Sequence, residues 1–149
     1  MPLTFPYVRK KDQYFPVVDI TLAIPPRPLS VKALVDSGAS FSVFRAEVLD
    51  YLAVPLERGA RVYLEGIGGR ILGYRHRVPV QVGEARFPLT VVFSREMAVS
   101  FNLLGRDNFF KQFLVVFDER HHLVRLDAYE SQELRLTQRI GSLRRDRTC

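Results

Sequence analysis

The 149-residue chain has very little cysteine and no long hydrophobic run, and each absence excludes a class of protein. Its one cysteine is the last residue, Cys149, so neither an internal disulfide nor a cysteine-based metal site can form. The longest apolar runs, such as residues 113–117, are far shorter than the roughly 20 residues of a membrane-spanning helix. The N-terminus has basic residues with no apolar segment after them, so we expect no secretory signal. These absences predict a cytoplasmic protein that contacts no membrane.

Most catalytic motifs with a known mechanism are also missing. The sequence contains no Walker loop and no HExxH, and residues 38–42 end in serine where a nucleophile elbow requires glycine. His121 and His122 are adjacent, so they cannot lie on one face of a strand. Placed in a turn, they are expected to be solvated loop residues rather than metal ligands. We therefore expect no metal and no organic cofactor.

Composition and charge describe an ordinary globular domain. Hydrophobic residues make up 47% and charged residues 26%, which argues against intrinsic disorder of the whole chain, and the length suits one domain. The formal net charge is +6, from 22 basic and 16 acidic residues. Because the basic residues are scattered, a mildly basic surface is favoured over nucleic-acid binding.

Short strands dominate the sequence pattern. Apolar and β-branched residues gather in the segments 15–24, 31–35, 61–64, 71–82, 87–93, 101–104, 114–117 and 123–126. Helical patterns are limited to 45–52, 107–112 and 129–140. Closely spaced strands with few helices predict an all-β barrel or sandwich.

One group of residues carries the chemistry of a candidate active site. The apolar segment 33–35 leads to Asp36, and the next residues are a hydroxyl, Ser37, and a glycine, Gly38, that permits a tight turn. By itself, Asp-Ser-Gly also fits an ordinary β-turn. Two later segments add to it: a glycine-rich turn between strands at 64–70, and an apolar pair that leads into a second glycine at 103–105.

These three elements, in this order, resemble the retropepsin-like aspartic peptidases, the single-lobed relatives of pepsin that include the retroviral proteases. The resemblance covers residues 17–126 and implies an all-β, retropepsin-like acid-protease barrel with one or two short helices. It implies a single lobe completed by homodimerisation, with an N-terminal arm (1–16), a protease domain (17–128) and a polar C-terminal tail (129–149), partly helical or disordered. The implied catalytic residues are Asp36, Ser37 and Gly38, and the implied substrate-binding residues are Ala39 and the flap residues Gly66, Ile67, Gly68 and Gly69.

The chain departs from the retroviral pattern at two positions. Many retroviral members have a second carboxylate two residues after the first glycine, paired with the arginine that follows the second glycine. Here those positions are Ser40 and Arg106, so Arg106 needs a different partner. Ser37 replaces the commoner threonine and keeps a hydroxyl that donates and accepts hydrogen bonds.

The aspartic peptidase reaction requires two carboxyl groups. One is ionised and takes a proton from water, and the other is protonated and donates its own proton toward the scissile carbonyl. Only Asp36 is followed by Ser-Gly, and the chain is too short for two lobes, so a homodimer with twofold symmetry is expected to supply the second aspartate. We expect the Gly38 amide to hold the carboxylate, with the amide of Ala39 as a second candidate donor. Ser37 is expected to donate a hydrogen bond across the dimer axis.

The resulting functional prediction is an aspartic endopeptidase that hydrolyses peptide bonds in extended peptide or protein substrates. One alternative is a catalytically silent dimer of the same fold that binds peptides or protein partners. Another is a nucleic-acid-associated protein that uses the arginine-rich tail. The intact Asp-Ser-Gly favours the enzyme, because a pure binding module does not need such a carboxylate.

Overall fold

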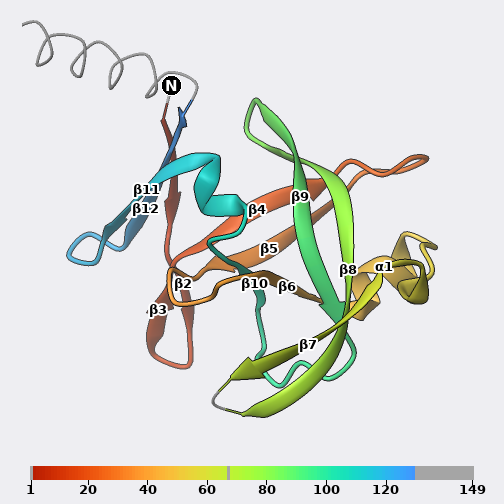
Figure 1. The fold of residues 1–149 in the computed structure, drawn as a ribbon. Coiled ribbons are helices and arrows are strands. Elements are labelled where there is room, and N and C mark those ends of the chain that lie inside the picture. The colour runs from red at the N-terminus through yellow and green to blue at the C-terminus, as the bar shows by residue number, and fades with distance from the viewer. Residues whose placement is uncertain (1, 67, 130–149) are drawn as a thin grey trace, which may run out of the picture.

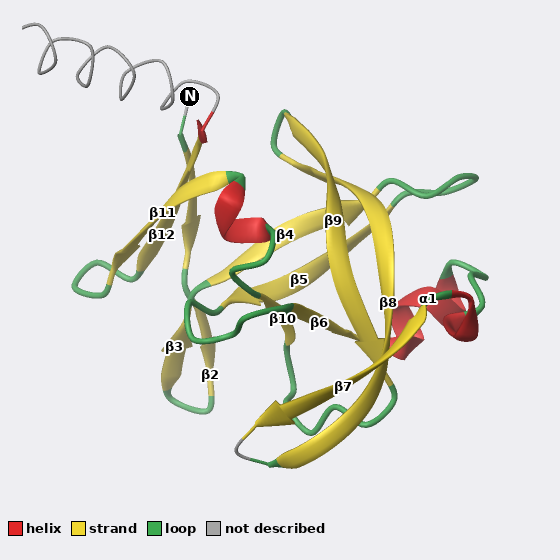
Figure 2. Cartoon of the chain, in the orientation of Figure 1, coloured by secondary structure: helices red, strands yellow, loops and turns green. Residues whose placement is uncertain are grey.

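The protein is mostly β-structure in its computed structural model, which describes residues 2–66 and 68–129 (Figures 1 and 2). The helical elements are α1 (Ala46–Tyr51), η1 (Leu56–Arg58) and η2 (Phe109–Lys111), the last two being single turns of 3₁₀ helix. The strands are β1 (Leu3–Pro6), β2 (Val8–Lys10), β3 (Gln13–Phe15), β4 (Val17–Leu22), β5 (Leu29–Val35), β6 (Ser42–Arg45), β7 (Ala60–Gly66), β8 (Gly69–Val82), β9 (Ala85–Ser94), β10 (Asn102–Leu104), β11 (Phe113–Asp118) and β12 (Leu123–Ala128). The predicted all-β, retropepsin-like class is confirmed.

A seven-stranded sheet in the order β4-β5-β10-β6-β9-β8-β7 forms the body of the molecule. The long strand β8 also pairs with β4 through Leu22 and Val80 and through Thr21 and Gln81. This second pairing curls the sheet back toward its first strand, but the ring of strands is not closed as a barrel.

Two smaller sheets flank the body. One has the order β1-β12-β11, and the other is the hairpin formed by β2 and β3. All three N-terminal strands lie in the segment expected as an arm, where the sequence pattern predicted no strand. The register of β1 on β12 places Leu3 opposite Leu126 and Phe5 opposite Val124.

One core cluster joins buried residues of the curled sheet to those of α1, η1, β11 and β12. In β4 the alternate residues Val18, Ile20 and Leu22 are buried, as the period of two predicts for a strand with one face inward. Each such side chain contributes about 1.5–3 kcal/mol of burial free energy. An aromatic cluster, with ring centroids 5.3–6.5 Å apart, closes the core beneath η2 and consists of Phe87, Phe109 and Phe113.

Only one of the three predicted helices is present as an α-helix among the described residues. The segment 45–52 contains α1, whereas 107–112 holds only the single turn η2. Most of the third expected helix, at 129–140, lies outside the described residues, as does most of the expected tail. Within the described ranges, no helix has the length and apolar character required to cross a bilayer.

Candidate active site

Asp36 stands at the end of β5, where a strand from much later in the chain is inserted beside it. The short strand β10 lies between β5 and β6, parallel to β5 and antiparallel to β6. Its register places Leu104 opposite Val35 and Leu103 opposite Val43. Pairing of β10 with β5 therefore brings the segment 103–105 to the start of the Asp36 loop.

Backbone and side-chain hydrogen bonds fix the shape of the loop that begins at Asp36. The Asp36 N–H donates to the carbonyl of Leu104 at 3.0 Å, and the Gly38 N–H donates to the Asp36 carboxylate oxygen Oδ1 at 2.9 Å. The Ala39 N–H donates to the backbone carbonyl of Asp36 at 3.2 Å and not to the carboxylate. Of the two expected amide donors, only Gly38 holds the side chain.

A second set of bonds joins the loop to the residues after β10. The N–H groups of Arg106 and Asp107 donate to the carbonyls of Ala39 and Ser40 at 2.9 and 2.8 Å. Gly105, which immediately precedes Arg106, is packed against the loop so closely that a Cβ there would lie under 3.0 Å from the carbonyl oxygens of Phe41 and Ala39. Only glycine fits this position without moving the backbone.

Two polar side chains, which the sequence interpretation did not identify, stabilise this arrangement. Asn102 accepts a bond from the Arg45 N–H at 2.9 Å and donates to the Lys32 carbonyl at 3.3 Å, so it connects β6 to β5 across β10. Ser42 is fully buried and accepts a bond from the Gly105 N–H at 3.0 Å. The available signal was a polar residue at a strand end among apolar neighbours, which alone does not identify its partner.

The structure supplies the partner that Arg106 lacked. Its Nη2 donates to the Ser40 hydroxyl at 3.3 Å, so serine receives the guanidinium where a retroviral carboxylate would stand. Both side chains are exposed, so this contact contributes little to stability. The ordering of the loop therefore rests mainly on the backbone bonds.

The two groups closest to the proposed chemistry remain open to other partners. Asp36 is half-buried, and its second oxygen, Oδ2, accepts no hydrogen bond from the described part of the chain. The Ser37 side chain is exposed and has no hydrogen-bond partner among the same residues. The loop thus has one carboxylate oxygen and one hydroxyl without a hydrogen-bond partner in the described part of the chain.

The expected flap is a hairpin of β7 and β8, whose last residue pair is Gly66 with Gly69. Gly69 has a φ of +103°, a conformation that favours glycine. Gly66 and Gly68 are exposed, and a Cβ at any of these three glycines would meet no atom within 4 Å. Ile67, the expected apolar tip, lies outside the described residues. The hairpin projects at the bottom of Figure 1, and no hydrogen bond joins its described residues to the Asp36 loop.

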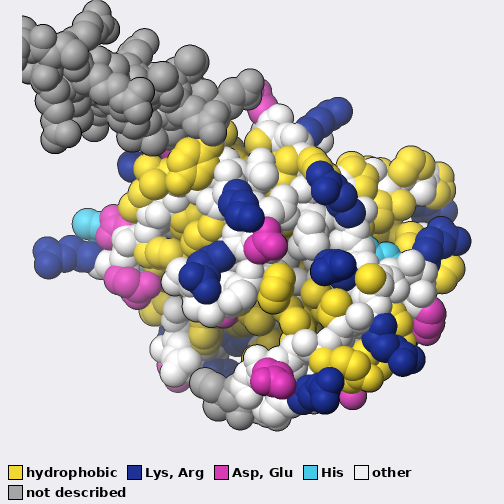
Figure 3. All heavy atoms as spheres, in the orientation of Figure 1, with side chains coloured by type: hydrophobic (Ala, Val, Ile, Leu, Met, Phe, Trp, Pro, Cys, Tyr) yellow, Lys and Arg dark blue, Asp and Glu magenta, His cyan; other side chains and the backbone are white. Residues whose placement is uncertain are grey.

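Charged side chains are dispersed over the face of the molecule that Figure 3 shows. Lys and Arg side chains are spread over the face in Figure 3, with Asp and Glu among them, and form no single basic patch there. Across residues 2–66 and 68–129, no group of three or more His, Cys, Asp or Glu side chains is arranged to hold a metal ion.

Comparison with known families agrees with this geometry. The family model of the aspartyl proteases matches residues 28–108, more than half of the chain, and this match includes β5, the Asp36 loop, the β7–β8 hairpin and β10. The chain belongs to the aspartyl protease family. A search of curated proteins finds no match.

Proposed function

We propose that the protein is an aspartic endopeptidase that cleaves peptide bonds in extended polypeptides. In this proposal Asp36 and Asp36 of the partner subunit activate a water molecule at a homodimer axis. The observation that carries the proposal is the state of the Asp36 carboxylate, which is held by the Gly38 amide on one oxygen and open on the other. Membership of the aspartyl protease family supports the same chemistry.

The chemistry follows from sharing one proton between two carboxylates. Two carboxylates at close range cannot both ionise, so one stays protonated while the other accepts a proton from water. The water oxygen attacks the scissile carbonyl carbon, and the protonated carboxyl donates to the carbonyl oxygen. The resulting tetrahedral diol then collapses: one diol hydroxyl gives its proton to the carboxylate that had donated, the C–N bond breaks, and the leaving nitrogen takes up the proton that the other carboxyl had taken from water. Activity should be bell-shaped in pH, because only the singly protonated pair works.

Ser37 and the hairpin complete the proposed site. The exposed Ser37 hydroxyl, unpartnered within the described ranges, is available to donate to the second copy of the loop across the axis. An extended peptide is held by main-chain hydrogen bonds to neighbouring strands, and the exposed glycines at the β7–β8 turn let backbone approach closely. We propose Ala39 and residues 66–69 as the substrate-binding positions.

Substitution of the aspartate tests the catalytic role. Asp36→Asn keeps the size of the side chain but cannot act as a base, so cleavage of a mixed peptide library at about pH 4–6 should be abolished with the fold intact. Asp19→Asn is the matched control, because Asp19 is an exposed aspartate on β4 that pairs with Lys32. Activity near the unsubstituted level in Asp36→Asn would refute the proposal. Peptide binding without cleavage by the unsubstituted protein would favour the catalytically silent dimer.

Dilution tests the requirement for two copies. If each site needs two Asp36 loops, specific activity must fall once the protein is diluted below the dimer dissociation constant. In that range the rate should scale with the square of the protein concentration. Constant specific activity at concentrations where sizing detects only monomer would contradict the dyad.

A further inference from the structure

The β2–β3 hairpin immediately precedes β4, the strand that pairs with β5 and so borders the segment leading to Asp36 (Figure 1). Pro16, the residue after β3, accepts a 2.8 Å hydrogen bond from the N–H of Val35, which immediately precedes Asp36. The ring of Phe15 packs against that of Phe101 with 5.1 Å between centroids, and Phe101 immediately precedes β10. The base of the hairpin is therefore attached to both strands that position the aspartate.

A second contact holds the hairpin in place on its other side. The ring of Tyr14 stacks on His122, in the turn between β11 and β12, at 3.9 Å between centroids and 12° between planes. The N–H of Tyr7, just before β2, donates to the His122 carbonyl at 2.8 Å. Anchored at two places, the hairpin presents its side chains at a fixed location.

The hairpin carries an excess of positive charge. It contains Arg9, Lys10 and Lys11 against one acidic residue, Asp12, which pairs with Arg9 at 2.7 Å. Lys10 and Lys11 are exposed, and neither forms an ion pair with a carboxylate in the described part of the chain. Lys10 and Lys11 are thus two cations of the hairpin without an acidic partner in the described part of the chain.

Lys10 is directed toward the strand that borders the aspartate. Its ammonium nitrogen lies 4.8 Å from the centroid of the Phe101 ring, a cation–π arrangement. This contact holds the charge against the chain segment that enters β10, although Lys10 itself belongs to the turn end of the hairpin. Phe101 packs in turn against Phe15, so the charge is linked through two rings to the base of the hairpin.

Resting on the peptidase function proposed above, we propose that Lys10 forms a subsite for an acidic side chain of the bound peptide. The Asp or Glu lies outside the two residues that flank the scissile bond, because Lys10 is at the turn end of the hairpin and the base of the hairpin is the part bonded to the segment before Asp36. An extended peptide advances about 3.3 Å per residue, so residues further from the scissile bond reach along the hairpin to the ammonium. A partly exposed ion pair of this kind changes affinity by about fivefold at most.

The test uses labelled peptides of one parent sequence in which a single Asp or its amide counterpart Asn occupies each position in turn. Dissociation constants are measured for the unsubstituted protein, for Lys10→Gln and for Arg86→Gln. Arg86→Gln is the matched control, because it removes one positive charge from an exposed residue of β9, near the β8–β9 turn. At one position Asp should bind about fivefold more tightly than Asn, and salt should weaken this preference.

The two substitutions decide the outcome. Lys10→Gln should abolish the preference for Asp, and Arg86→Gln should retain it. Absence of any preference, its survival in Lys10→Gln, or its equal loss in both variants would overturn the acidic subsite. The test measures binding and not cleavage. A protein that binds the peptides without cleaving them would contradict the proposed peptidase, and the ratio of Asn-peptide to Asp-peptide dissociation constants would still test Lys10. Cleavage with no acidic preference contradicts the subsite alone.

Discussion

The buried Ser42 hydroxyl accepts a 3.0 Å hydrogen bond from the backbone N–H of Gly105. The bond joins β6 to the turn after β10, and so it ties together the two segments that enclose the Asp36 loop. Ser40, two residues earlier, is exposed and makes only a 3.3 Å contact with Arg106. The two serines therefore form a matched pair for measuring what holds the loop.

Ser42→Ala should lower the free energy of unfolding by about 1–3 kcal/mol, because a buried N–H loses its acceptor. Ser40→Ala should change it by no more than about 0.5 kcal/mol, as an exposed position allows. Urea denaturation of both variants measures the difference. Equal destabilisation by the two substitutions would show that the Ser42 bond does not order the loop.

Gly105→Ala should destabilise the fold by about 1–3 kcal/mol or more, because its Cβ would collide with the carbonyls of Phe41 and Ala39. Gly68→Ala is the control, since a Cβ there would meet nothing within 4 Å. Thermal unfolding should show a lowered midpoint for Gly105→Ala only. An unchanged midpoint for Gly105→Ala would contradict the close approach of the two segments.

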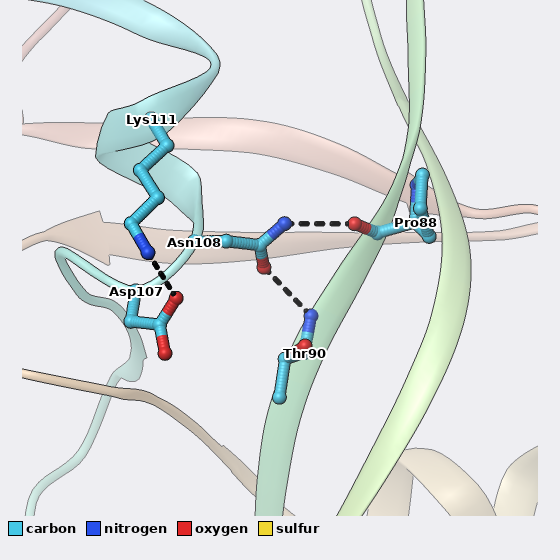
Figure 4. A network of polar contacts seen from close by, with 5 residues as sticks. All are labelled: Pro88, Thr90, Asp107, Asn108 and Lys111. Atoms are coloured by element: carbon cyan, nitrogen blue, oxygen red, sulfur yellow. Dashed lines mark hydrogen bonds and ion pairs between the residues drawn. The ribbon is translucent and has the colours of Figure 1, made fainter.

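Asn108 connects the turn before η2 to β9 and offers a pH-dependent test (Figure 4). Its amide oxygen accepts from the Thr90 N–H at 2.8 Å, and its amide nitrogen donates to the Pro88 carbonyl at 2.9 Å. In Asn108→Asp an ionised carboxylate cannot donate to Pro88, so about 1–3 kcal/mol of stability should be lost at neutral pH. Protonation restores a donor, so the loss should shrink in acid.

The pH dependence of the Asn108→Asp destabilisation distinguishes loss of the hydrogen bond to Pro88 from a simple loss of packing. The protonated carboxyl can donate to the Pro88 carbonyl as the amide does, whereas the ionised form cannot, so this contact exists at low pH and disappears as pH rises. Asn108→Ala removes both bonds, and its deficit relative to the unsubstituted protein should not depend on pH. Parallel pH profiles for the two variants, measured by chemical denaturation, would count against the Pro88 contact.

Tyr7 should titrate far later than an ordinary tyrosine. Burial, together with its 2.8 Å hydrogen bond to Glu119, raises the pKa of Tyr7 to about 12. Because the folded-state pKa lies above the unfolded value of 10.0, the contribution of Tyr7 to stability is fully present below about pH 10. It is lost as pH rises through about 12. Ultraviolet titration should lose its latest step in Tyr7→Phe and keep it in Tyr51→Phe, since Tyr51 is 67% exposed; the reverse result would place the late step elsewhere.

Ser37→Ala should weaken the proposed dimer. Removing a hydrogen bond worth about 0.5–1.5 kcal/mol from each of two symmetric sites raises the dissociation constant by about tenfold or more. Ser30→Ala, an exposed serine earlier on β5, is the control. Sedimentation or sizing across a dilution series measures both, and an unchanged constant in Ser37→Ala would remove the cross-axis bond from the proposal.

The sequence predicted the elements that follow local rules. Alternation of apolar residues identified β4 and β8, and the Asp-Ser-Gly at the end of an apolar run identified the Asp36 loop. The strands β1 to β3 were missed, because they are short, contain prolines or charges, and depend on partners far along the chain. The strand at Leu3–Pro6, for example, exists through its pairing with residues 123–126.

Within the candidate site, the missed features are also those formed by distant residues. The contact of Arg106 with Ser40, and the bridge that Asn102 makes between β5 and β6, become visible only once β10 is placed between two strands. Hydrophobic period carries no information about such an insertion. The roles of Ser37 and of the flap glycines stay predictions, since they concern a second copy and a substrate.

The insertion of β10 between β5 and β6 also determines when the Asp36 loop can form during synthesis. A growing chain that ends before Leu104 has Asp36 but lacks the carbonyl that receives its N–H, and it lacks the residues that bind Ala39 and Ser40. Contacts between distant residues also form late, because a long loop must close first. The nascent protein therefore carries its aspartate in a segment without a fixed geometry until most of the domain has left the ribosome.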